Sequence, residues 1–130
     1  MERRRQMMNL FKKKSKKEPA LNPIKTLTFT NSKGFKGFKR LQIVTHGIVD
    51  DPKAMPDTDG KEIRIDLKWS GSGDPFCDVF LAGERVGCLF NENVIPINEQ
   101  NIDGAHLDYD LRHGANEDYY HPRLFIHIAE

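Results

Sequence analysis

The fold class follows from the stretch EIRIDLKW at residues 62–69, in which every second residue is apolar. Successive side chains of a β-strand point to opposite sides, so this strict alternation is typical of a strand with one buried face. The apolar face consists of Ile63, Ile65, Leu67 and Trp69. The stretch therefore predicts a strand that packs on a core with one face and meets water with its charged face.

Shorter segments on either side show strand character too. Residues 24–29 alternate apolar residues with threonines, and apolar residues recur at 41–44 and 124–128. Residues 106–112 alternate again, with Leu111 among the side chains expected to point inward. These segments predict further short strands.

A hairpin is predicted for residues 77–90, around Gly83-Glu84. Glycine at the first central position suits a type II′ turn. This turn would pair Leu81 with Val86, Val79 with Cys88 and Cys77 with Phe90, and would place all six side chains on one core face. The hairpin would then bury both cysteines.

In that register Cys77 and Cys88 are diagonal neighbours at about 7–8 Å. This separation is long for a disulfide. We therefore expect two buried free thiols. The chain has no Cys-x-x-Cys, which excludes the common zinc-finger and redox frameworks.

The remaining segments are rich in residues typical of turns. Residues 49–60 carry two prolines and four aspartates and predict an exposed loop, and residues 114–122 predict a turn. Residues 91–104 could hold a short helical turn or an irregular loop. The chain is thus predicted to be mostly β with minor α: a small OB-like or SH3-like barrel or a sandwich of about six strands.

Charge divides the chain into two parts. Residues 1–25 hold nine Lys or Arg against two Glu, a net charge of +7, whereas residues 26–130 hold eleven against seventeen Asp or Glu, a net charge of −6. The basic segment has too little apolar surface to offset the entropy of ordering it. We therefore expect a disordered basic arm at residues 1–22 and, because 130 residues suit one domain, a single β-rich domain at residues 23–130.

Targeting signals are not evident in the sequence. The apolar run near the start is short and is followed at once by three lysines at 12–14, which argues against a secretory signal peptide. No window has the apolar length of a membrane span. We expect a cytoplasmic protein without a transmembrane segment.

A Gly-Phe-Lys triplet occurs twice between residues 34 and 39. Cations can contact phosphates and exposed rings can stack on bases, the combination found in proteins that bind single strands. The alternative is that both phenylalanines enter the core while the cations face water. The candidate nucleic-acid-binding residues of this segment are Lys33, Phe35, Lys36, Phe38, Lys39 and Arg40.

Catalytic signatures are missing from the sequence. It contains no Gly-x-Ser-x-Gly, no P-loop, no His-Glu-x-x-His and no dinucleotide fingerprint. His106, Asp108 and Asp110 should share one strand face and offer metal-ligand chemistry, although such a face is usually polar only because it meets water. We therefore expect a non-catalytic protein that needs no cofactor, with this metal site as a weak alternative.

The segments DPFCDVFL at 74–81 and GERVGCL at 83–89 resemble the signature of the HIRAN domain. That signature has an Asn-Pro-aromatic-Asp loop, a strand, a glycine turn and a Val-Gly-Tyr-Leu strand. The resemblance implies a small OB-like barrel that binds single-stranded DNA ends. Phe76 would then stack on a base, and Asp78 or Asp74 would bond the terminal hydroxyl. Asp74 stands where the family has Asn, and Cys88 where it has Tyr.

Two functional hypotheses follow from these features. The first is a nucleic-acid-binding module for single-stranded DNA, supported by the basic arm, the Gly-Phe-Lys repeat and the hairpin signature. The second is an accessory domain that binds a protein partner through an open strand edge, which needs no visible motif. The negative charge of residues 26–130 opposes the first hypothesis unless the basic residues gather on one face.

Overall fold

The structure is a computed structural model that describes residues 24–31, 36–45, 51–69 and 73–129. The predictions for the arm at residues 1–22, for Lys33 and for Phe35 lie outside these ranges. Within them, none of the helices is both long and apolar enough to cross a membrane.

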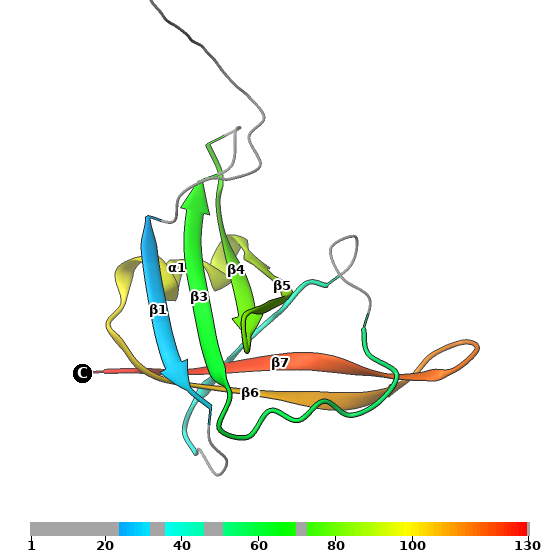
Figure 1. Cartoon of the computed structure of the whole chain (residues 1–130). Coiled ribbons are helices and arrows are strands. Elements are labelled where there is room, and N and C mark those ends of the chain that lie inside the picture. Colours follow the sequence, from blue (N-terminus) through cyan, green and yellow to red (C-terminus); the bar gives the residue numbers. More distant parts are fainter. Residues whose placement is uncertain (1–23, 32–35, 46–50, 70–72, 130) are drawn as a thin grey trace, which may run out of the picture.

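The protein is mostly β, as the sequence predicts, and its strands form two antiparallel sheets (Figure 1). The four-stranded sheet has the order β1-β3-β4-β5, and the three-stranded sheet has the order β2-β7-β6. Seven strands are described, one more than expected. Their bounds are β1 Lys25–Thr30, β2 Lys39–Leu41, β3 Glu62–Trp69, β4 Pro75–Leu81, β5 Glu84–Phe90, β6 Ile102–His113 and β7 Asp118–Ile128.

Two connections join the sheets at their edges. Val44, just beyond β2, exchanges two backbone hydrogen bonds with Cys88 of β5, at 2.8 and 2.9 Å. At the other edge, the side chain of Asn31 donates to the carbonyl of Leu107 at 2.7 Å and accepts from its N–H at 2.9 Å. The buried Asn31 amide thus satisfies the N–H and carbonyl of Leu107, which point away from β7 and have no neighbouring strand in the described structure.

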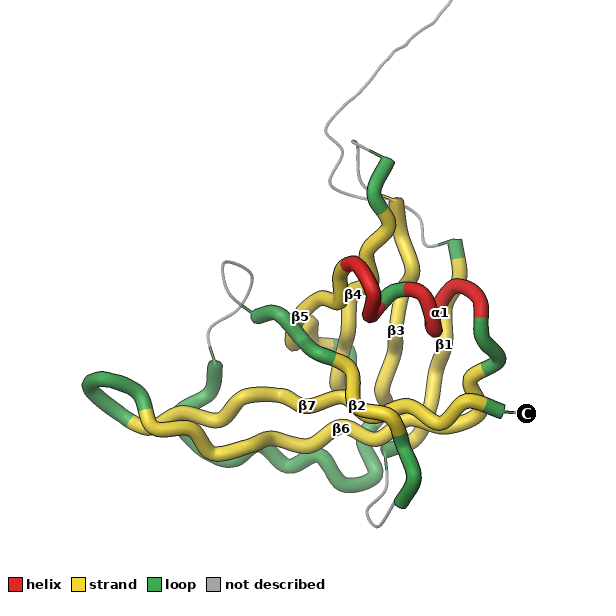
Figure 2. Tube along the Cα trace, turned by 180° about the vertical axis from the view of Figure 1, so that it is seen from behind, coloured by secondary structure: helices red, strands yellow, loops and turns green. Residues whose placement is uncertain are grey.

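The core lies between the sheets. It contains Ile65 and Val79 from one sheet and Leu107 and Ile126 from the other, all fully buried. The segment after β5 forms a 3₁₀ turn at Asn91–Asn93 and the short helix α1 at Ile95–Glu99, in agreement with the helical alternative for residues 91–104. Figure 2 shows α1 on the core side of the four-stranded sheet.

The alternation in β3 predicted its buried face correctly. Ile63, Ile65 and Leu67 are completely buried. Trp69 is the exception, since it ends the strand and keeps 43% of its surface exposed.

The predicted hairpin turn is wrong by one residue, so the partner of Leu81 changes from Val86 to Glu84. Leu81 pairs with Glu84, so the two turn residues are Ala82 and Gly83, with φ angles of 52° and 84°. Positive φ at both positions defines a type I′ turn, the other favoured two-residue hairpin. A bulge beside Val79 then shifts the register once more, with Val86 as the extra residue.

This bulge moves Cys88 and Phe90 to the opposite face. Cys77 faces Leu89 in the core, whereas Cys88 faces Asp78 and Phe90 faces Phe76 on the other side of the sheet. Both thiols are nevertheless free and buried, as expected.

The last hairpin is longer than predicted. β7 begins at Asp118, so the expected turn at 114–122 shrinks to residues 114–117. Pro122 can lie within β7 because β2 pairs with this strand only from Leu124 onward. At Pro122 the side of β7 that faces away from β6 has no described strand beside it, so the missing N–H of proline costs no ladder hydrogen bond. Leu111 is 46% exposed, contrary to the inward orientation expected for it, because this end of β6 extends beyond the core.

Candidate functional site

The candidate site is the outer face of the four-stranded sheet, defined as the face that points away from the core. The side chains on it follow from strand alternation and from the observed register. They are Thr26, Thr28 and Thr30 of β1; Glu62, Arg64, Asp66 and Lys68 of β3; Phe76, Asp78 and Phe80 of β4; and Arg85, Cys88 and Phe90 of β5.

No other described element covers the outer face, because α1 and the three-stranded sheet both lie on the core side of the sheet (Figures 1 and 2). Two of its side chains are buried all the same: Asp78 is 4% exposed and Asp66 is 6% exposed. The residues that shield these carboxylates from water are therefore their own neighbours on the face.

Asp78 lies at the centre of a charged cluster. One carboxylate oxygen accepts from Arg85 Nη2 at 2.8 Å, and the other is 3.0 Å from Lys68 Nζ. The Cys88 thiol donates to the first oxygen at 3.2 Å and accepts from the same Arg85 nitrogen at 3.1 Å. Two cations thus share one buried carboxylate, which satisfies its charge.

Asp66, directly opposite Asp78 on β3, is held separately. It accepts a hydrogen bond from Thr26 Oγ1 at 3.1 Å and lies 3.4 Å from Arg64 Nε. The Arg64 guanidinium also covers the Phe80 ring, 4.0 Å from its centroid. An arginine this close to a ring makes a cation–π contact.

Aromatic rings occupy the end of the outer face where β4 begins. Phe76 and Phe90 lie side by side, with ring centroids 6.3 Å apart and planes inclined by 29°. Phe90 is 38% exposed, and Trp69, opposite the adjoining Pro75, is more exposed still. This end of the sheet therefore presents ring surface to solvent.

The Cys88 thiol on the outer face is held in its protonated form. Burial raises the pKa of the Cys88 thiol, and the hydrogen bond to Asp78 adds to this rise against the opposing effect of Arg85. A protonated, buried thiol is a poor nucleophile. Three cations of β3–β5 (Arg64, Lys68 and Arg85) stand against the two buried carboxylates, so the centre of the face carries a small positive charge.

The residues predicted from the hairpin signature lie at this site. Phe76 belongs to the aromatic end, and Asp74 is exposed just before β4. Asp78 is on the outer face too, but both its oxygens are engaged by Lys68 and Arg85. Of the two predicted acids, Asp74 is therefore the more accessible.

The Gly-Phe-Lys segment lies elsewhere. Lys39 and Arg40 belong to β2 of the three-stranded sheet and are exposed, as is Lys36. The Phe38 ring packs against His127, with centroids 5.1 Å apart, and is only partly buried. Figures 1 and 2 both show β2 well below the end of the sheet where β4 begins. The structure thus does not bring these residues together with Phe76 on one surface.

The weak alternative of a metal site receives no support from the geometry. His106, Asp108 and Asp110 do share one face of β6. Asp108, however, forms two hydrogen bonds with Arg123, at 2.8 and 2.9 Å. In the part of the chain that the structure describes, no three His, Cys, Asp or Glu side chains are grouped as metal ligands.

Sequence reasoning missed most of the outer face. Arg64 and Lys68 were assigned to the charged side of β3 without a role, and Cys88 and Phe90 of β5 were placed on the wrong face. A type I′ turn at Ala82-Gly83 alone would still pair Cys88 with Cys77 on the core face, so the bulge beside Val79 is what moves Cys88 and Phe90 to the outer face. This bulge leaves no mark in the sequence that would have revealed it.

Comparisons with known protein families, with curated proteins and with solved structures found no match.

Proposed function

We propose that this chain is a non-catalytic module that binds single-stranded nucleic acid on the outer face of its four-stranded sheet. One observation carries the proposal: an antiparallel face that no other described element covers combines neighbouring phenylalanine rings with cations. The rings are Phe76 and Phe90, and the cations nearest the centre of the face are Lys68 and Arg85.

Stacking is the sequence-tolerant part of single-strand binding, because every base has a flat aromatic surface. The exposed ring of Phe90 offers one platform, and Phe76 beside it extends that platform along the sheet. Arg64, lying flat on Phe80, adds a planar cation that can stack on a base or contact a phosphate. These contacts favour unpaired bases over a duplex, whose bases stack on one another.

Phosphate binding would need more positive charge than the centre of the outer face supplies. Lys68 and Arg85 share the negative charge of Asp78. The strongly basic residues 1–25, with a net charge of +7, are the main source of further attraction. The proposal therefore assigns stacking to the sheet and most of the salt-dependent attraction to the basic segment.

The resemblance to HIRAN domains supports a narrower form of the proposal, in which the ligand is a single-stranded DNA end. Phe76 would stack on the terminal base. Asp74, exposed at the same end of the sheet, would accept a hydrogen bond from the terminal hydroxyl, because Asp78 is buried.

The test of the main proposal is fluorescence anisotropy of a labelled 15-nucleotide oligothymidine at about 50 and 200 mM salt. Replacing Phe76 and Phe90 together by Ala should weaken binding about tenfold or more, since base–aromatic stacking contributes about 1–3 kcal/mol per base. The dependence on salt should stay unchanged, because the phosphate contacts remain. Quenching of Trp69, the only tryptophan, gives an independent readout at the same end of the sheet.

The matched control is Phe125→Ala, which removes a partly buried phenylalanine from the solvent side of the three-stranded sheet. It should change the affinity less than twofold. Absence of binding at low salt, or an equal loss in the control, would show that the outer face is not the binding site.

The end-binding form has its own test. An oligonucleotide with a free 3′-hydroxyl should bind more tightly than the same strand with a 3′-phosphate, and Asp74→Asn should reduce this preference. Equal affinity for the two oligonucleotides would rule out recognition of the 3′ end and would be consistent only with binding along the strand.

A second candidate function is the binding of an extended peptide by β1. This strand is the last in its sheet, so in the described structure only its β3 side pairs with another strand. A partner strand could add to the other side through backbone hydrogen bonds. A pull-down that returns one stoichiometric protein and no nucleic acid would favour this function over the first.

A further inference from the structure

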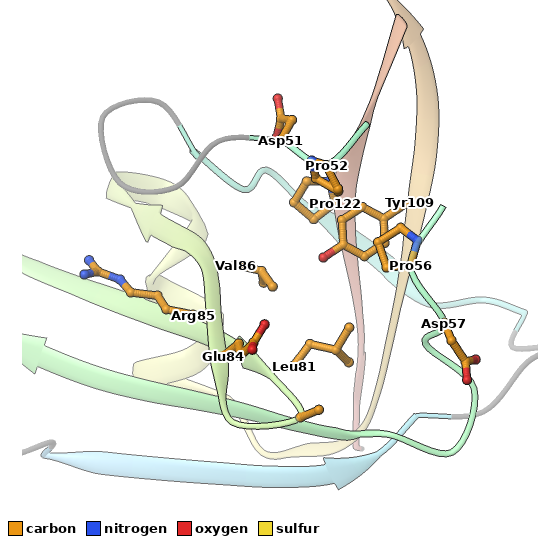
Figure 3. Close-up of a pocket in the computed structure, with 11 residues that line it drawn as sticks. Asp51, Pro52, Pro56, Asp57, Leu81, Glu84, Arg85, Val86, Tyr109 and Pro122 are labelled. Atoms are coloured by element: carbon orange, nitrogen blue, oxygen red, sulfur yellow. The ribbon is translucent and has the colours of Figure 1, made fainter. Parts of the chain in front are cut away.

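A cavity of about 370 Å³ opens between the tip of the β4–β5 hairpin, the segment at residues 51–57 and the β6–β7 hairpin (Figure 3). This volume is within the range of small-ligand sites. The cavity is separate from the aromatic end of the outer face, since none of its lining residues is Phe76, Phe90 or Trp69.

Much of the lining is hydrocarbon. Pro52, Pro56 and Pro122 form one side, and Leu81 and Val86 form the side toward the hairpin (Figure 3). Prolines are rigid and have no side-chain donor, so this part of the cavity can contact methylene groups but cannot hydrogen-bond through its side chains.

Tyr109 provides a polar group inside the cavity. The residue is 8% exposed, and its hydroxyl points into the cavity (Figure 3). That hydroxyl makes no hydrogen bond with any residue that the structure describes. A nearly buried phenol usually has a partner. The hydroxyl is therefore available to a ligand.

Carboxylates make the cavity negative. Asp51, Asp57 and Glu84 line it, although Asp57 points outward (Figure 3) and lies 3.9 Å from Lys61, and Arg85 is the one cation among the described lining residues. The Arg85 guanidinium points away from the cavity and bonds to Asp78 on the outer face (Figure 3). The charge that a ligand would meet is consequently that of the acids.

The position of Asp51 is held by neighbouring side chains. Thr45 Oγ1 donates to one of its oxygens at 3.0 Å, and His121 Nδ1 lies 3.3 Å from that oxygen. Glu84, by contrast, forms no ion pair within the described ranges. Burial raises the pKa of Tyr109 to about 12, and the charges of Asp51 and Glu84 contribute to the rise, which indicates that both acids act on the phenol.

We propose that this cavity binds an alkylammonium group, either the side chain of a lysine or a free alkyl diamine. The ammonium would form ion pairs with the carboxylates of Glu84 and Asp51 and donate a hydrogen bond to the Tyr109 oxygen. The methylene chain would contact the prolines and Leu81. An anion would be repelled by the carboxylates of Asp51 and Glu84. A metal ion is disfavoured because the acids are not grouped as metal ligands in the described structure.

The first experiment compares charged and neutral ligands of equal length. Full-length protein is titrated with 1,5-diaminopentane and with 1-pentanol, and binding is followed by NMR shifts of residues around the cavity. The diamine should bind at least tenfold more tightly than the alcohol. Equal affinities would overturn the proposal, because the cavity would then recognise only hydrocarbon.

Two variants separate the polar groups from the packing. Tyr109→Phe keeps the ring and removes the unpartnered hydroxyl, and Glu84→Gln keeps the shape and removes a charge. We expect the diamine affinity to fall about tenfold for Tyr109→Phe and about threefold for the exposed Glu84→Gln. Glu92→Gln, an exposed acid outside the cavity, is the control and should change nothing. Unchanged affinity in both cavity variants would overturn the assignment.

A third comparison identifies the source of the ammonium. The peptide acetyl-Gly-Lys-Gly-amide is titrated beside its norleucine counterpart and beside the diamine. Tighter binding of the lysine peptide than of the diamine would identify a protein side chain, and the reverse order would identify a free amine. A lysine peptide no tighter than its norleucine counterpart, together with no preference for the diamine over the alcohol, would reject both sources.

This inference does not depend on nucleic-acid binding. Phe76→Ala with Phe90→Ala should leave diamine binding intact, and Tyr109→Phe should leave oligonucleotide binding intact. Each proposal can thus fail without the other.

Discussion

The two faces of the four-stranded sheet both exclude water, but they do so by different means. On the inner face, Ile65 and Val79 are completely buried beneath the hydrocarbon of the second sheet and α1. On the outer face, the carboxylates of Asp66 and Asp78 are almost as buried, although no other described element covers them. Their shielding comes from charged and aromatic neighbours on the same face.

The two faces should therefore respond differently to amino-acid substitution. Burial on the inner face is non-directional and depends on filled volume. Burial on the outer face depends on specific partners, because a buried carboxylate without its cation is strongly unfavourable. A lost methylene group should therefore matter most inside, and a lost charge should matter most outside.

The largest effect is expected for Ile65→Ala on the inner face. Removing this side chain should lower the free energy of unfolding by about 3–4 kcal/mol, because the two sheets cannot close the cavity completely. Urea unfolding followed by Trp69 fluorescence measures the change. Leu111→Ala, at a site 46% exposed, should shift stability by about 0.5 kcal/mol or less. Similar losses in the two variants would contradict a tightly packed inner face.

The next effect is expected for Asp78→Ala on the outer face. The variant leaves Lys68 and Arg85 facing each other and should lose about 2–3 kcal/mol. The loss of stability should be smaller than for a fully buried ion pair, because the Arg85 side chain is 41% exposed and can be hydrated.

The control is Asp108→Ala, which breaks the pair with Arg123 on the three-stranded sheet. Both side chains there are about one-third exposed, and the loss should be about 1 kcal/mol or less. If both variants lost the same free energy, burial of Asp78 by its neighbours would have no energetic consequence.

A smaller effect is expected when the pH is raised, because the inner face contains the buried thiol of Cys77. Burial, with a contribution from Asp78, raises the pKa of the inner-face Cys77 thiol from 9.0 to about 12. The unfolded chain then releases this proton first, so stability is present below about pH 9 and is lost as the pH rises toward 12. At about pH 10.5 the loss should be about 2 kcal/mol.

The measurement compares urea unfolding of wild type and Cys77→Ala at about pH 8 and 10.5. The variant should lose less stability than wild type over this range. An equal pH dependence in the two proteins would show that the thiol does not resist ionisation in the folded state.

The smallest effect is expected for Arg64→Lys on the outer face. Lysine keeps the charge near Asp66 but cannot lie flat on Phe80, so about 0.5–1 kcal/mol should be lost. A double-mutant cycle with Phe80→Leu isolates this contact. A coupling energy of zero would mean that Arg64 acts only through its charge.

The sequence predicted individual strands better than their pairing. The alternation in β3 located both its bounds and its buried face, because the period of two is a property of consecutive residues. The hairpin was located correctly but given the wrong turn. Ala82 was not expected in the left-handed region, which residues other than glycine and asparagine rarely adopt.

The candidate site was predicted only in part. Phe76 and Asp78 were selected from the hairpin signature, and both belong to the outer face. The one-residue error in register hid Phe90 and Cys88, because a slip of one residue moves a side chain to the opposite side of a sheet. The Phe-Lys segment was selected on composition, which carries no information about which sheet a strand joins.

By itself, the sequence determined that the chain is mostly β, where its clearest strand lies and which side of that strand is apolar. These properties depend on residues that are near one another along the chain. Long-range packing, by contrast, buries two aspartates on a face that no other described element covers and brings Tyr109, Glu84 and the prolines together around a cavity. Such encounters depend on a turn, a bulge and the packing of two sheets, which bring together residues from distant segments.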